Sequence, residues 1–85
     1  MLLAATILVT SAAAQKKPLP PAPVNVNTAT VAELKTLPGL GEAMAKDIVR
    51  YREKNGPFRR VEELLIIKGI SKKRLEGWKP YLKIN

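Results

Sequence analysis

Two short glycine-containing segments are the residues of this sequence whose types and spacing suggest chemistry. Gly39-Leu40-Gly41 and Gly69-Ile70-Ser71 each precede a stretch with helical periodicity. The first backbone N–H groups of a helix lack intrahelical partners, and the helix dipole favours negative charge there. Because glycine has no Cβ, an anion can approach these donors closely. Each segment is therefore predicted to bind a phosphate group.

Basic residues accompany these segments. Lys72, Lys73 and Arg74 occupy the first turn of the helix expected after the second segment, where cations oppose the helix dipole. A contact with phosphate explains them better than helix stabilisation does, and we assign the same role to Lys46. For Arg52 the sequence allows either a carboxylate or a backbone partner. Other cations are assigned to solvated helix faces: Lys35, Lys54 and Lys83.

Composition limits the classes of function that this chain can have. Its 85 residues include 15 Lys+Arg and 7 Asp+Glu, which gives a net charge of +8, and they include neither His nor Cys. Thiol nucleophiles, imidazole bases, disulfides and structural zinc sites made of these residues are thereby excluded. We therefore expect a non-enzymatic binding module with no cofactor, no metal and no small-molecule substrate. Its partner is expected to be an acidic polymer.

The chain repeats itself from Asn25 onward at an offset of 30 residues. Gly39 returns as Gly69, and the residues that match are mostly apolar or glycine, which determine packing and backbone shape. Each unit is therefore predicted to form the same supersecondary element, and the two units to bury a common core. Further matched pairs are Val31 with Val61, Leu34 with Leu64, Leu37 with Ile67, Leu40 with Ile70, Ala45 with Leu75 and Ile48 with Trp78.

Helix signals in each unit indicate a short helix, a tight turn and a second helix. Thr30 and Glu33 form a capping box that opens a helix predicted to run to Leu37. A longer helix is predicted over 42–54, a short one over 61–67 and a last one from the second turn to Trp78. Since no stretch alternates with period two, an all-α fold of four to five short helices is expected. Five apolar or aromatic residues are assigned to the core rather than to stacking on bases or to solvent: Leu40, Ile70, Tyr51, Phe58 and Trp78, with Tyr81 beside them.

Ahead of the repeat lies a segment with a different composition. Residues 1–14 are almost entirely apolar or small and end in three alanines, which predicts a signal peptide. Residues 15–24 are rich in proline and are expected to form an extended linker, and 25–85 the folded domain. Cleavage would make the protein periplasmic or secreted. The alternatives are an uncleaved apolar anchor or a first core helix.

Several motifs together resemble the tandem helix-hairpin-helix domain of ComEA-type competence proteins. They are the Asn-Val-Asn-Thr-Ala opening at 25–29, the Leu-Pro-Gly-Leu-Gly hairpin at 37–41, Tyr51-Arg52 and Asn55-Gly56-Pro57-Phe58. The resemblance implies binding of double-stranded DNA without sequence preference, during DNA uptake in natural transformation. DNA-uptake proteins are the further partners it implies. By the same resemblance, amides of both hairpins contact phosphates of opposite strands: Gly39, Leu40 and Gly41 in one, Gly69, Ile70 and Ser71 in the other.

Three positions depart from the family pattern. Ser71 replaces the second glycine of the second hairpin, and Lys68 stands where the first hairpin has Pro38. Glu42 follows the first hairpin and would repel a phosphate, so the second hairpin is expected to contribute more to binding. Two alternatives stay open: a protein-interaction or scaffold module of the cell envelope, and an intracellular accessory protein of DNA repair or recombination.

Overall fold

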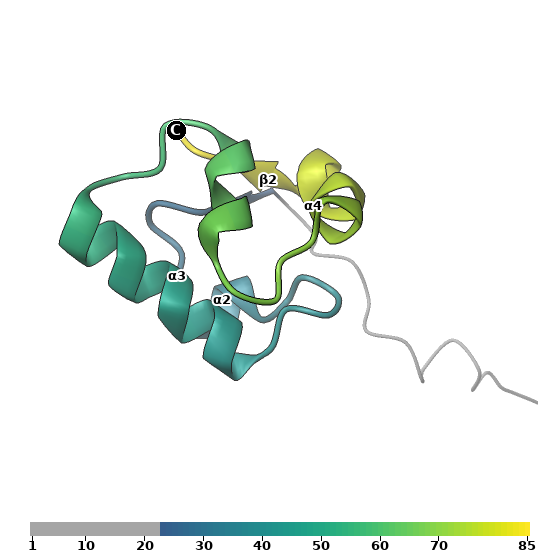
Figure 1. Ribbon diagram of the computed structural model, residues 1–85, viewed down its shortest axis with the longest axis horizontal. Helices are drawn as coiled ribbons and strands as arrows, with labels where there is room; N and C mark the ends of the chain where they lie inside the picture. The colour runs from purple at the N-terminus through teal and green to yellow at the C-terminus, as the bar shows by residue number, and fades with distance from the viewer. Residues whose placement is uncertain (1–22) are drawn as a thin grey trace, which may run out of the picture.

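Short helices and one very small sheet make up the part of the chain that the structure describes, residues 23–85 of a computed structural model (Figure 1). The predicted signal peptide and all but the last two residues of the predicted linker lie outside it. The elements follow in the order β1 (Val24–Asn25), α2 (Val31–Leu34), α3 (Glu42–Asn55), the 3-10 helix η1 (Val61–Ile66), α4 (Lys72–Trp78), the 3-10 helix η2 (Lys79–Tyr81) and β2 (Leu82–Lys83).

Helix α2 begins as its sequence predicts and ends earlier. The Thr30 side chain accepts a hydrogen bond from the Glu33 amide, and the Glu33 carboxylate accepts one from the Thr30 amide, which confirms the capping box. Beyond Leu34 the amides of Thr36 and Leu37 donate to carbonyls three residues back. The chain tightens here because Pro38 disfavours the α conformation at the residue before it.

Helix α3 is the longest element, and its bounds agree with the prediction to within one residue. It ends where Gly56 adopts a φ of 90° and donates its amide to the Arg52 carbonyl. Glycine takes this conformation without the steric cost that a Cβ imposes. The following Pro57 prevents the helix from continuing.

The second unit is wound differently from the first. The helix predicted over 61–67 is the 3-10 helix η1, and its N-cap residue Arg60 makes no side-chain cap. A short segment without a cap gains little from α-helical nucleation, so tighter i to i+3 bonds suffice to connect its neighbours. Helix α4 is capped by Ser71, whose Oγ accepts from the Arg74 amide at 3.1 Å.

The described chain is mostly helical, as predicted, and the one addition to the expected helices is a two-stranded parallel sheet. Val24 pairs with Leu82 and Asn25 with Lys83, so the two ends of the described chain lie side by side. Strands of two residues are too short to produce an alternating pattern in the sequence. Val24, assigned above to the linker, is buried with 8% exposure and belongs to the folded part.

One apolar core joins both units. Leu34 and Ile48 come from the first unit, Leu64 and Trp78 from the second, and all are almost completely buried. The Phe58 ring is also buried and stacks on Tyr51 with ring centroids 4.9 Å apart. Tyr51 and Tyr81 are partly buried against this cluster. The assignment of the aromatic residues to packing is thus confirmed.

Polar groups at the periphery hold the connecting segments together. The side chain of Asn27 donates to the carbonyls of Phe58 and Ile84 and accepts from the Phe58 amide, at 2.7–2.9 Å. The Arg52 guanidinium donates to the Val26 carbonyl at 2.9 Å. Of the two partners the sequence allowed for Arg52, the structure therefore has the backbone one. Within 23–85, no helix has the length and apolar character to cross a membrane.

Candidate nucleic-acid interface

The two glycine-containing turns have the same backbone geometry. In turn one (residues 38–41) Gly39 has a φ of 81°, and in turn two (residues 68–71) Gly69 has a φ of 95°. The N-cap residues that follow, Gly41 and Ser71, are both extended, with φ of −87° and −90°. Only the first glycine of each turn therefore requires glycine, which explains why serine is accommodated at 71.

The apolar residue inside each turn is turned toward the core. Leu40 is 1% exposed and Ile70 is 6% exposed, as predicted. Their amides donate to the carbonyls of Leu37 and Ile67 at 3.0 and 3.1 Å. Leu40 and Ile70 are predicted from the sequence to offer their amides to phosphate, and in the structure both N–H groups donate within the turn. Both residues instead fix the turn to the core.

The neighbouring amides are the ones left available. Gly39, Gly41, Gly69 and Ser71 are exposed, and their amides have no hydrogen-bond partner among residues 23–85. The same holds for the first two amides of each following helix, those of Glu42, Ala43, Lys72 and Lys73. Unpaired N–H groups that point out of a helix start favour an anion. Each turn thus offers a small group of backbone donors.

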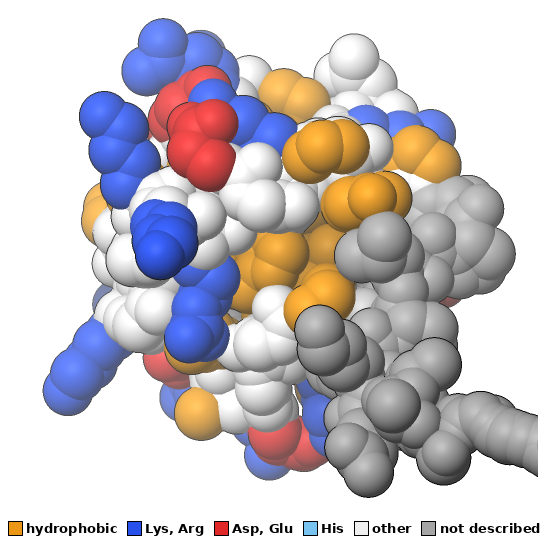
Figure 2. Space-filling model, turned by 90° about the vertical axis from the view of Figure 1, so that its right-hand side faces the viewer, with side chains coloured by type: hydrophobic (Ala, Val, Ile, Leu, Met, Phe, Trp, Pro, Cys, Tyr) orange, Lys and Arg blue, Asp and Glu red, His pale blue; other side chains and the backbone are white. Residues whose placement is uncertain are grey.

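Lys72 and Lys73 give turn two its positive charge. Both side chains are exposed at the start of α4, and neither forms an ion pair within the described part of the chain. Figure 2 shows Lys and Arg side chains gathered along one side of the face that it presents, next to a central hydrophobic area. Exposed ammonium groups on flexible side chains can follow a phosphate backbone.

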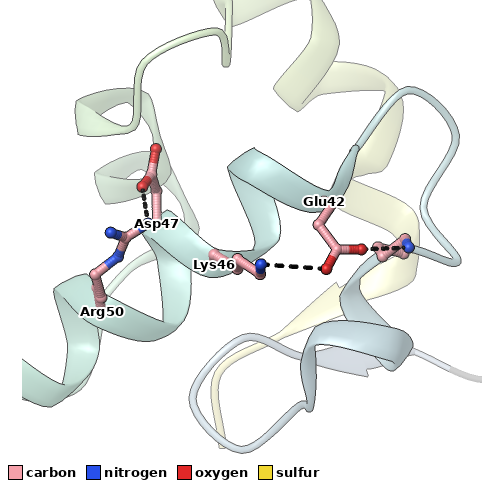
Figure 3. A network of polar contacts seen from close by, with 5 residues as sticks. Glu42, Lys46, Asp47 and Arg50 are labelled. Carbon is pink, nitrogen blue, oxygen red and sulfur yellow. Dashed lines mark hydrogen bonds and ion pairs between the residues drawn. The ribbon is translucent and has the colours of Figure 1, made fainter.

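Turn one carries a different set of charges. Glu42 accepts from Lys35 at 2.7 Å and lies 3.5 Å from the Lys46 ammonium (Figure 3). The hydrogen bond from Lys35, followed by its charge and by Lys46, lowers the pKa of the Glu42 carboxyl below its ordinary value. The negative charge expected beside turn one is thus partly compensated. Lys35, assigned above to a solvated face, is one of the residues that compensate it.

The Arg74 side chain contacts turn one, although its position in the sequence suggests a contact with turn two. It follows turn two, yet its Nη1 donates to the Gly39 carbonyl of turn one at 2.7 Å. Trp78 of the same helix donates its Nε1–H to the Pro38 carbonyl, also at 2.7 Å. These contacts span 35 and 40 residues, and no local pattern in the sequence indicates them. Helix α4 therefore holds turn one from the other unit.

Two further groups of ion pairs involve residues outside the two turns. Asp47 and Arg50 form an i,i+3 pair at 2.9 Å on α3 (Figure 3), and Lys79 lies between Glu62 and Glu76. These two carboxylates raise the pKa of Lys79. Within the described residues no group of three or more acidic side chains is arranged to hold a metal ion. The polar features that remain close to both turns are the amides and the basic residues.

Comparison with known proteins matches residues 21–83 to the helix-hairpin-helix motif family. A protein of Haemophilus influenzae without a described function is 50% identical over 54 residues, which are 62% of this chain and 48% of that protein. ComE operon protein 1 of Bacillus subtilis is 43% identical over 53 residues, 62% of this chain and 26% of that protein.

A second kind of relative is a much larger protein. The human endonuclease/exonuclease/phosphatase family domain-containing protein 1 is 49% identical over 53 residues, 62% of this chain. The match spans only 9% of the length of the human protein. The similarity therefore covers only a short segment of these relatives.

Proposed function

We propose that this chain, which belongs to the helix-hairpin-helix family, binds double-stranded DNA without sequence preference. The observation that carries the proposal is the repetition, at two turns, of exposed amides that have no partner within residues 23–85. At turn two these amides lie beside the exposed Lys72 and Lys73. Backbone donors at helix starts suit phosphate oxygens. The similarity to ComE operon protein 1 supports the same role.

Both turns act together in this proposal, as a tandem pair of hairpins. Their equal geometry and their attachment to one core make two phosphate sites with a fixed separation, so each can contact one strand of the same duplex. Amide and ammonium groups contact the sugar–phosphate backbone, which carries no direct sequence information. The role is one of binding, and no catalytic step is part of it.

Salt dependence tests the electrostatic part of the proposal. If about four to six phosphates are neutralised, log affinity falls with log salt concentration with a slope of roughly −4 to −5. The full chain is titrated by fluorescence anisotropy with two unrelated duplexes of equal length. Equal affinities and this slope are expected, whereas a slope near zero or a strong preference for one duplex would contradict the proposal.

The biological setting we propose is DNA uptake in natural transformation, with the protein as a DNA receptor in the periplasm that hands DNA to uptake proteins. The resemblance to ComEA-type proteins and the apolar first segment support this setting. A deletion strain should lose transformation and periplasmic retention of DNA. Sequencing the N-terminus of the purified protein should find Gln15, whereas an intact Met1 would contradict cleavage of a signal peptide.

A protein-interaction module is the second candidate, and one observation favours it. Leu65 and Ile66 are 42% and 63% exposed on η1, beside a groove of about 360 Å³ between η1 and α3. Exposed apolar side chains at a groove are typical of docking surfaces. A gel-shift assay with duplex DNA discriminates, because a module that only docks to protein leaves the DNA mobility unchanged.

A further inference from the structure

The two units contact each other in a reciprocal way. Gly39 and Gly69 are equivalent in the 30-residue repeat, and so are Met44 and Arg74, the third residues of α3 and α4. A Cβ added at Gly39 would lie 3.3 Å from Nη1 of Arg74, and one added at Gly69 would lie 2.9 Å from Cε of Met44. The third residue of each helix thus covers the turn glycine of the other unit.

The two side chains that cover the turn glycines differ in polarity and charge. Met44 places an apolar thioether against turn two, whereas Arg74 places a charged, exposed guanidinium against turn one. One Arg74 nitrogen donates to the Gly39 carbonyl, and the guanidinium forms no ion pair within residues 23–85. A guanidinium has five N–H donors in a planar fork, so several remain available.

The charges that each unit supplies to its own turn differ in the opposite sense: turn two, which Met44 covers, has more positive charge from its own unit than turn one, which Arg74 covers. Turn two is followed by Lys72 and Lys73. Turn one is followed by Glu42, whose carboxylate forms ion pairs with Lys35 and Lys46. A phosphate at turn one would find little free positive charge from its own unit. The Arg74 guanidinium, 2.7 Å from the Gly39 carbonyl, supplies it from the other unit.

We propose that Arg74 serves turn one rather than turn two: it fixes the Gly39 peptide and completes the phosphate site there with its remaining donors. The proposal rests on the proposed function, since it concerns how the chain contacts DNA. It makes turn one a composite site built from both units. It also predicts that the effect of Arg74 on binding depends on turn one alone.

A double-mutant cycle tests this dependence in the full chain, with a duplex of random sequence. Arg74→Met, which copies the residue of the equivalent position, should weaken binding about five- to tenfold, as expected for a lost charged hydrogen bond. The loss should largely disappear when Gly39→Ala has already disturbed turn one, and persist when Gly69→Ala has disturbed turn two. Equal losses in both backgrounds would overturn the proposal.

A second measurement does not depend on glycine variants. In amide NMR spectra, DNA should shift the signals of Gly39 and Gly41 in the unmodified chain, and less so in Arg74→Met, while the shifts of Gly69 and Ser71 stay. Shifts reduced equally at both turns would contradict the assignment of Arg74 to turn one. If the unmodified chain itself binds no duplex in dilute buffer, the proposed function fails, which is a separate outcome.

Discussion

Turns one and two place the same backbone in two different chemical settings. Both have a left-handed glycine and an extended N-cap residue, and both direct one aliphatic side chain into the core. Turn one is held by Arg74 and Trp78 and lies beside a carboxylate between two lysines. Turn two is covered by Met44 and followed by Lys72 and Lys73, which form no ion pair within residues 23–85.

The difference suggests a division of roles between two copies of one motif. The repeated features fix the backbone donors, so both copies keep the geometry that a phosphate requires. The features that differ decide how much positive charge each copy offers. Turn two supplies its charge from its own helix, and turn one depends on the other unit. Variants that change one turn at a time can break or sharpen this comparison.

The largest effect is expected at the two left-handed glycines. Gly69→Val and Gly39→Val each force a β-branched residue into a positive φ, which costs more than about 1–2 kcal/mol, and each should weaken DNA binding at least about tenfold. Gly69→Val should be the more severe, because the added Cβ meets Met44 at 2.9 Å and turn two has the free lysines.

Anisotropy titrations measure both losses, and circular dichroism provides the control for folding. Helicity should be largely retained, because neither turn lies inside a helix: α2 ends before turn one, and α3 and α4 begin after turns one and two. Gly56→Val is a matched control, since Gly56 also has a positive φ but follows the C-terminal end of a helix, where no helix-start amides are offered. Unchanged affinity in both turn variants would remove the amides from the binding site.

The next largest effect concerns the lysines of turn two. Replacing Lys72 and Lys73 together with alanine should reduce the salt slope by about 1.8, if each contacts one phosphate. Lys46→Ala should reduce it less, because Lys46 lies 3.5 Å from the Glu42 carboxylate. Lys54→Ala, at the far end of α3, is the control for net charge. Equal slopes for the lysine pair and for the unmodified chain would contradict the division of roles.

A smaller effect is expected for the hydrogen bond between Trp78 and turn one. Trp78→Phe keeps an aromatic ring in the core and removes the Nε1–H that donates to the Pro38 carbonyl at 2.7 Å. The free energy of unfolding should fall by about 1 kcal/mol, measured by denaturant titration. Tyr81→Phe, which keeps its ring at the edge of the core, provides a control. A loss no greater than that of the control would show that the hydrogen bond from Trp78 to turn one adds no stability.

The smallest effect is expected at Glu42, and it is the only substitution expected to increase the affinity for DNA. Glu42→Gln removes a negative charge beside turn one and the ion-pair partner of Lys46, so DNA binding should tighten about two- to threefold at low salt. Since the folded-state pKa of Glu42 is lowered, its ion pairs stabilise the protein above pH 4.5 and are lost as the pH falls through the folded pKa. Glu42→Gln should remove that part of the pH dependence of unfolding. Weaker binding by the variant would show that Glu42 positions the lysines for DNA.

Local signals predicted much of the fold and part of the site. The Thr30 capping box, the stop at Gly56 and the inward orientation of Leu40 and Ile70 follow from neighbouring residues, and all are confirmed. The bent backbone of both turns follows from the repeated glycine at 39 and 69.

What the sequence missed depends on contacts between distant residues. The pairing of Val24 with Leu82 joins two strands of two residues, which leave no period in the sequence. The contact between Arg74 and Gly39 spans 35 residues, so it depends on how the two units pack and not on a local sequence pattern. The available signal was the 30-residue repeat, which makes positions 44 and 74 equivalent, and each of these residues contacts the turn glycine of the other unit.

Amide NMR of the full chain during titration with duplex DNA tests the central claim most directly. Backbone amides at both turns are the phosphate donors of this account, so the signals of Gly39, Gly41, Gly69 and Ser71 should shift most. The shifts should be the same for two unrelated duplex sequences and should vanish at high salt. The account would be contradicted if DNA bound without shifting these four amide signals. It would also be contradicted if DNA instead shifted the amide signals of residues that line the groove between η1 and α3.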